Sequence, residues 1–185
     1  MMKMRKSIYT LSRLLLVTLL VLSLGGCNII AVIELHQDKT ISSADGKWSL
    51  TVPGTWVDAT DSNQDMQLEV ACQNPEQYVG ILAFGKANLV TICDDLEHFV
   101  ELRMMDFENA LANMQAGDFT QTQVAGCDGL SVEVTGYSSA YKYIYWLTYL
   151  ETEDAFVEVQ GYSLASNADD VRDTVRGVME TLKIQ

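Results

Sequence analysis

The chain has 185 residues, and 12 Lys and Arg stand against 25 Asp and Glu, so its formal net charge is −13 at pH 7. A surface of this sign repels phosphate backbones and anionic lipid head groups, which argues against a nucleic-acid partner and against a purely electrostatic contact with a membrane. The length suits one folded domain, and the sequence contains no internal repeat or low-complexity tract.

The first 27 residues have the pattern of an export signal. Basic residues at positions 3, 5, 6 and 13 precede an apolar run over 14–24, which is short for a membrane span, and the run ends in Leu24-Gly-Gly-Cys27. This ending resembles the lipobox of bacterial lipoproteins, and the resemblance implies a diacylglycerol on the Cys27 thiol and cleavage before that residue. The alternatives are an uncleaved single-span anchor and an ordinary secretory signal, which also place the rest of the chain outside the cytoplasm.

Cleavage before Cys27 predicts three parts: a signal peptide over 1–26, a lipidated N-terminus and tether over 27–39, and a domain over 40–185. It removes four of the twelve basic residues and no acidic residue, so 8 minus 25 leaves a net charge of −17. Acyl chains contribute roughly 0.8 kcal/mol of membrane affinity per buried methylene. We therefore expect a protein held on the cell membrane by its lipid anchor and facing outside the cytoplasm.

Turn signals divide the next part of the chain into two predicted hairpins. Asp45-Gly46 is one turn signal, followed by alternating apolar and polar residues, and Asn74-Pro75 is the other. The apolar start of 28–43 fits either a tether or a strand, and we prefer a tether that merges into a strand near Thr40. The four strands expected around the two turns cover residues 40–43, 47–52, 66–72 and 78–85.

Two later segments have the periodicity of helices. Asp94 with Glu97 three residues later predicts a capped helix start, and apolar residues then recur at helical spacing as far as Met114. A final helix is expected to begin at Ser166, with Asp169 at its third position. This order argues for an α+β fold, an antiparallel β-sheet with helices packed on it, rather than a doubly wound parallel sheet. The strands expected between the helices cover residues 119–124, 129–136, 140–150 and 155–164.

Four segments carry structural motifs: a strand ending in Pro-Gly-x-Trp over Asp45–Trp56, a helix start over Asp95–Phe99, a glycine turn over Val124–Leu130 and a terminal helix over Met179–Lys183. In these segments the chain resembles the PsbP-like group, over about residues 40–185. The group includes the extrinsic PsbP subunit of photosystem II, a nuclear-import factor that binds the Ran GTPase, and many bacterial lipoproteins. The resemblance implies an α/β/α sandwich and a role in binding other proteins, but it transfers no functional residue.

The search for catalytic motifs finds no Gly-x-Ser-x-Gly, no phosphate-binding glycine loop, no His-Glu-x-x-His and no Cys-x-x-Cys. We therefore expect a protein that is not an enzyme and needs no cofactor. Asp94, His98 and Glu101 share one side of the first predicted helix, where a weak metal site is conceivable. A solvated polar face accounts for the same residues, and we assign no metal, because a dedicated zinc site brings three or four ligands from more than one element.

Three cysteines remain besides Cys27, an odd number for an exported protein. The expected strand directions place Cys72 at one end of the sheet and bring Cys93 and Cys127 to the other. A Cys93–Cys127 disulfide with Cys72 as a thiol is the preferred pattern. Three buried thiols in a protein from an anaerobe are the alternative.

The predicted strand over 140–150 carries the main functional signal. Period two places its tyrosines on one face and Ile144 and Trp146 on the other. Polar residues of neighbouring strands, among them Glu133 and Glu158, are expected beside the tyrosines, in an aromatic and acidic surface of the kind enriched in protein interfaces. The alternative is a central strand covered on both faces. The candidate binding residues are Tyr141, Tyr143, Tyr145, Tyr149, Glu133 and Glu158.

Two function classes follow from these observations. The favoured one is a membrane-anchored, non-catalytic module for protein interaction or assembly, with a protein partner whose identity the sequence does not give. The other is a lipoprotein that binds a small ligand or a metal cation and serves a membrane transporter, with its site on the tyrosine and glutamate face. A long pocket lined by these residues favours a ligand, whereas a flat exposed patch favours a protein partner.

Overall fold

The computed structural model describes residues 37–89 and 91–185, so the predicted signal peptide, Cys27 and most of the predicted tether lie outside the described residues. The unit discussed below comprises residues 38–52 and 56–185. Within this described part, each helix is too short or too polar to cross a bilayer.

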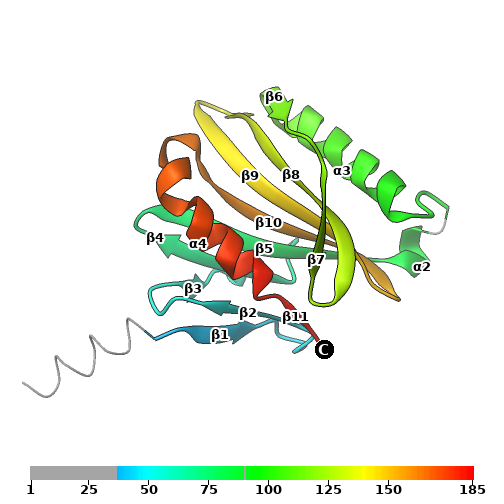
Figure 1. Ribbon diagram of the computed structural model, residues 1–185, viewed down its shortest axis with the longest axis horizontal. Coiled ribbons are helices and arrows are strands. Elements are labelled where there is room, and N and C mark those ends of the chain that lie inside the picture. Colours follow the sequence, from blue (N-terminus) through cyan, green and yellow to red (C-terminus); the bar gives the residue numbers. More distant parts are fainter. Residues whose placement is uncertain (1–36, 90) are drawn as a thin grey trace, which may run out of the picture. The chain divides into compact units, whose positions relative to one another are not determined.

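The described residues form two antiparallel sheets and short helices (Figure 1). The strands are β1 (Lys39–Ser42), β2 (Trp48–Val52), β3 (Val57–Asp58), β4 (Leu68–Gln73), β5 (Glu76–Gly85), β6 (Ala112–Ala116), β7 (Thr120–Val124), β8 (Cys127–Ser138), β9 (Tyr141–Glu151), β10 (Ala155–Leu164) and β11 (Lys183–Ile184). The helices are α2 (Lys86–Leu89), α3 (Leu96–Ala110) and α4 (Ala168–Glu180), with 3-10 turns η1 (Thr60–Ser62) and η2 (Ala165–Asn167). The small sheet has the order β1-β2-β11, and the large sheet has the order β3-β4-β5-β10-β9-β8-β6, with β7 also paired to β8. The predicted antiparallel α+β architecture is confirmed.

Helix α4 and strand β2 cover one face of the large sheet. Helix α4 crosses β10 at Gly161, where a Cβ atom would lie 2.3 Å from Val175 Cγ1 and 2.7 Å from Met179 Sδ. The helix therefore approaches the sheet more closely than a larger residue on β10 would allow. Trp48 of β2 is 2% exposed and belongs to the same buried cluster as Val175, so the small sheet and α4 share one core.

Helix α3 packs on the opposite face of the large sheet. The Phe99 ring stacks on the Phe156 ring of β10 with centroids 5.0 Å apart, in a cluster separate from the one beneath α4. The N-cap of α3 is Asp95, one residue after the predicted cap Asp94, because the Asp95 side chain accepts a hydrogen bond from the backbone N–H of His98 at 2.8 Å. A helix on each face places the core in two layers, one on either side of the sheet.

Helix α3 ends at Ala110, so the predicted helix as far as Met114 is wrong. Leu111 is extended, Asn113 has a φ of 53°, and the segment from Ala112 becomes β6 on the edge of β8. Leu111 is buried and Met114 packs against the same cluster as α3, so apolar residues continue across the boundary. The helical spacing of the apolar residues therefore identified side chains that share one core with α3. The backbone conformation after Leu111 is set instead by pairing with β8.

The last helix also starts later than predicted. Ser166 lies in η2, and α4 begins at Ala168, with Asn167 at the cap position and no capping hydrogen bond from its side chain. The acidic residues Asp169 and Asp170 occupy the first turn of α4, where they complement the positive end of the helix dipole.

Candidate functional site

A row of tyrosines crosses the α3 side of the large sheet, beside the C-terminal half of α3. Tyr162 of β10 stands opposite Tyr78 of β5 and Tyr145 of β9 in the strand register. Its ring stacks on both neighbours, with centroids 4.7 Å from Tyr78 and 5.6 Å from Tyr145, and the Tyr143 ring lies 6.2 Å from Tyr145. All four side chains are partly exposed. We call Tyr78, Tyr162, Tyr145 and Tyr143 the tyrosine row.

The row joins two predicted tyrosines to two that the sequence did not single out. Tyr78 and Tyr162 each lie in a strand that the sequence did predict, but their place beside Tyr145 depends on the cross-strand register. Knowledge that 78–85 pairs with 155–164 would have placed Tyr78 beside Tyr162, because residues directly opposite each other on neighbouring antiparallel strands share a face. Hydrophobic period alone does not give that pairing.

The other two predicted tyrosines lie apart from the row. Tyr149 is 0% exposed, its ring lies edge-on to Phe99, and its hydroxyl donates to the Met104 sulfur at 3.8 Å. Burial raises the pKa of the Tyr149 hydroxyl well above its usual range. Tyr141, which is 62% exposed, pairs with Ser138 at the β8–β9 hairpin. Of the predicted binding face, Tyr149 therefore belongs to the core, and Tyr141 lies at the turn.

Glu133 lies on the opposite face of the sheet from the tyrosines, contrary to the prediction. Its carboxylate accepts a hydrogen bond from Trp146 Nε1 at 3.0 Å and pairs with Arg172 of α4. The register places Val134, rather than Glu133, beside Tyr145. The alternation of polar and apolar residues predicts the polar face of this strand, but it does not report on which side of the sheet that face lies.

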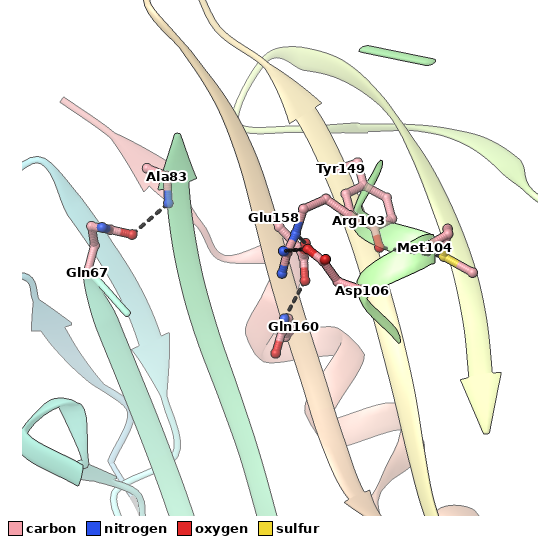
Figure 2. Close-up of polar contacts among 8 residues, drawn as sticks. All are labelled: Gln67, Ala83, Arg103, Met104, Asp106, Tyr149, Glu158 and Gln160. Carbon is pink, nitrogen blue, oxygen red and sulfur yellow. Dashed lines mark hydrogen bonds and ion pairs between the residues drawn. The ribbon is translucent and has the colours of Figure 1, made fainter. Parts of the chain in front are cut away.

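Glu158 lies on the tyrosine side, next to Tyr149, and is fully buried. Figure 2 shows Arg103 and Asp106 of α3 meeting Glu158 and Gln160 of β10. Arg103 Nε is 2.5 Å from Glu158 Oε2, and the Gln160 amide donates to the other carboxylate oxygen. Burial opposes the charge of Arg103, but the hydrogen bond and charge of Glu158 outweigh it and raise the Arg103 pKa. This buried ion pair fastens α3 to the sheet.

Carboxylates fix the hydroxyl groups at one end of the tyrosine row. Tyr162 donates to Glu69 at 2.6 Å, and Tyr78 donates to Glu76 at 2.7 Å. Glu69 is 2% exposed, and this burial raises its pKa, although the hydrogen bond from Tyr162 acts in the opposite direction. The hydrogen bond to Glu76, with burial, raises the pKa of Tyr78 to about 12. At neutral pH these tyrosines are therefore uncharged, and their rings are held in place by the bonded hydroxyls.

A small open hollow of about 220 Å³ lies where the row meets α3. This is below the volume of typical small-molecule sites, which is roughly 300–1,000 Å³. The row is thus better suited to contact a protein surface than to enclose a ligand. The hollow is lined by Arg103, Asp106, Phe107, Ala110, Tyr145 and Gln160.

The three described cysteines are thiols, so the preferred Cys93–Cys127 disulfide is not formed. Cys93 belongs to the cluster beneath α3. Cys127, the first residue of β8, packs against the cluster beneath α4, so the sheet separates the two thiols. The Cys93 thiol donates to the Asp95 carbonyl at 3.2 Å, and burial raises its pKa. Cys72 donates to the Asn74 carbonyl at 3.7 Å.

Of the three residues of the conceivable metal site, only His98 and Asp94 contact each other. His98 Nδ1 is 3.4 Å from Asp94 Oδ1, which is a contact within one exposed turn. Among the described residues, no group of three or more His, Cys, Asp or Glu side chains is arranged to hold a metal ion.

No family model matches the chain, and no curated protein matches it by sequence. Solved structures do match its fold. LpqN of Mycobacterium tuberculosis, described as involved in cell envelope biogenesis, superposes with a TM-score of 0.58 at 13% identity, covering 80% of this chain and 91% of LpqN. Cyanobacterial PsbP from Synechocystis gives a TM-score of 0.57 at 9% identity, covering 80% of this chain and 92% of PsbP.

The Ran-binding protein Mog1p of Saccharomyces cerevisiae matches to a similar degree. Its TM-score is 0.57 at 11% identity, and the match covers 80% of this chain and 96% of Mog1p. The domain therefore has the PsbP-like fold that the sequence resemblance implied. At these identities the likeness concerns the fold alone.

Proposed function

We propose that this protein is a lipid-anchored, non-catalytic interaction module that holds a protein partner outside the cytoplasm. The observation that carries the proposal is the tyrosine row, in which stacked, partly exposed rings have hydroxyls bonded to Glu69 and Glu76. Tyrosine contributes a large amphipathic surface and loses little conformational entropy on binding, which is why it is enriched at interfaces. A row that is already ordered in the unbound protein lowers the cost of association.

The charge of the domain indicates the chemistry of such a partner. Residues 37–185 contain 8 Lys and Arg and 24 Asp and Glu, so 8 minus 24 gives a net charge of −16. Glu76, which is exposed, lies at the end of the row. A partner with a basic docking surface is favoured, because complementary charge accelerates encounter and suppresses contact with acidic proteins.

The structural neighbours are compatible with a binding role. Mog1p is described as a Ran-binding protein, and LpqN is described as involved in cell envelope biogenesis. Only the presentation of a surface to another protein carries over from these neighbours to this chain. The surface that we propose for this chain is its own tyrosine row.

Site-specific photocrosslinking in native membranes tests the partner. A benzoylphenylalanine at Tyr143 should crosslink one discrete protein, and the same probe at Tyr137 is the control, because alternation along β8 puts it on the other face and it is 42% exposed. Adding Tyr78→Ala to the Tyr143 probe should reduce the crosslink severalfold, because hot-spot aromatics contribute much of the binding energy. Equal crosslinks at both positions, or no effect of Tyr78→Ala, would contradict the proposed face.

Metabolic labelling tests the anchor. The wild-type chain should incorporate radiolabelled palmitate and lose residues 1–26, whereas Cys27→Ser should remain unlabelled, because the lipid is expected on that thiol. Equal label on both proteins, or an intact segment 1–26 in the mature wild type, would refute the lipoprotein assignment.

A further inference from the structure

A second hollow, of about 350 Å³, lies on the α4 side of the large sheet, opposite the tyrosine row. We call it the α4 groove. Its volume is within the range of small-molecule sites. The lining residues of one wall come from β7 and the residues before it, those of the floor from β8 and β9, and those of the other wall from α4. The residues used below are Asp118, Thr120, Glu133, Trp146, Arg176 and Glu180.

The groove exists because α4 lies over β10 rather than over the centre of β8 and β9. Gly161 of β10 lets Val175 and Met179 of α4 approach the sheet closely, which draws the helix to that strand. Trp146 and Thr148 of β9 thus become the floor between α4 and β7. The hollow follows from the position of a helix that is itself well packed, so it is a fixed part of the fold.

The polar groups of the floor are held in place. Glu133 accepts a hydrogen bond from Trp146 Nε1 at 3.0 Å, and Arg172 lies over the Trp146 ring, 5.5 Å from its centroid. The Ser131 and Thr148 hydroxyls are 2.9 Å apart and bonded to each other. A floor of ordered side chains binds a ligand with little loss of conformational entropy.

The charges of the lining select the class of ligand. Three carboxylates, from Asp118, Glu133 and Glu180, stand against two guanidiniums, that of Arg176 in the lining and that of Arg172 over Trp146, so 2 minus 3 gives a local net charge of −1. Arg176 is 3.7 Å from Glu133, whereas Asp118 and Glu180 have no ion-pair partner within residues 37–89 and 91–185. A cation is therefore attracted, and an anion is repelled.

We propose that the α4 groove binds a small organic ammonium compound. Its ammonium group pairs with the unengaged carboxylates of Asp118 or Glu180 at the rim, and its apolar part lies against Val124, Trp146 and Met179. The groove is on the other side of the sheet from the tyrosine row, so this site is independent of the proposed partner face.

Isothermal titration calorimetry on the full chain in detergent tests the ligand class. The probes are 2-phenylethylamine and 3-methylbutylamine, with 3-phenylpropanoate as the matched anion and 2-phenylethanol as the neutral analogue. Both amines should bind saturably with one site, and the anion should bind at least about tenfold more weakly, which corresponds to about 1.4 kcal/mol. Absence of saturable binding by both amines, or equal affinity for amine and anion, would overturn the proposal.

Variants assign the binding to the groove. Glu180→Gln and Asp118→Asn should each weaken the amines by about fivefold, the scale of one partly exposed charge pair. Thr120→Phe should block the groove without changing its charge. Glu97→Gln, an acidic residue in the first turn of α3, is the matched control and should leave affinity unchanged. Equal weakening by Glu97→Gln, or full affinity in Thr120→Phe, would show that the amines bind by general attraction to the acidic surface.

Discussion

The buried ion pair between α3 and the sheet makes the sharpest stability prediction. Glu158 is 0% exposed, and its counter-ion Arg103 also lies 5.1 Å from the Phe84 ring. Arg103→Met keeps an aliphatic side chain at this position but leaves the carboxylate of Glu158 buried without a counter-ion. Breaking such a pair costs about 3–5 kcal/mol, so we expect Arg103→Met to lower the free energy of unfolding by that amount.

A double-mutant cycle separates the pair from simple loss of packing. Arg103→Met with Glu158→Leu removes both charges, and an apolar replacement of a buried pair is often close to neutral. The double variant should therefore be more stable than Arg103→Met alone by about 2 kcal/mol or more. Urea unfolding followed by circular dichroism gives both the midpoint and the slope needed for this comparison.

Asp106→Asn is the matched control for the same guanidinium. Asp106 is bonded to Arg103 at 2.5 Å, but its side chain is 63% exposed, so its pair is a surface pair within one helix. We expect this change to cost about 0.5 kcal/mol or less. If Arg103→Met costs no more than Asp106→Asn, or if the double-mutant cycle is additive, the pair is not desolvated and the reasoning about α3 fails.

Three further changes test the core and the acidic residues. Trp48→Ala should lower the free energy of unfolding in denaturant by about 3–5 kcal/mol, because the ring is 2% exposed in the larger core cluster. An unchanged midpoint would mean that the Trp48 ring does not face this core. Gly161→Ala should cost about 1–3 kcal/mol, since the new methyl group meets Val175 and Met179; a neutral result in the same assay would show that α4 shifts freely. Burial raises the pKa of Glu69 above its ordinary 4.5, so the native state keeps this proton to higher pH than the unfolded state does, and stability falls as the pH rises from 4.5 through the raised native value. Glu69→Gln should flatten that part of the profile of thermal midpoint against pH, and an unchanged profile would argue that the carboxylate is solvated.

Local signals predicted much of this fold. Asp45-Gly46 marks a real hairpin turn, and Gly46 has a φ of 72°, a conformation that favours glycine. The alternation over 140–150 separated the two faces of β9 correctly, since Tyr145 and Trp146 belong to clusters on opposite sides of the sheet. These features depend on neighbouring residues in the chain, and a single sequence contains them.

Features set by partners distant in sequence could not be predicted in the same way. The spacing of Met114 predicts a helix, but pairing with β8 makes that segment a strand. The sequence places Glu133 on the tyrosine face only by assumption, because nothing in its own strand reports the register that sets it opposite Trp146 of β9. The pairing of Cys93 with Cys127 failed for a related reason, since it required knowing which face each element covers.

The small sheet joins segments from opposite ends of the domain, and this has a consequence for folding. Thr51 of β2 donates its backbone N–H to Thr181 Oγ1 at 2.8 Å across 130 residues, and Ile184 of β11 pairs with Trp48. Contacts of such high sequence separation make folding slow, because a long loop closes before they form. During synthesis the N-terminal strands leave the ribosome first. Trp48 therefore lacks its final neighbours until α4 and β11 have also been synthesised. Products cut short before α4 are expected to be cleared by proteases rather than to persist with partial activity.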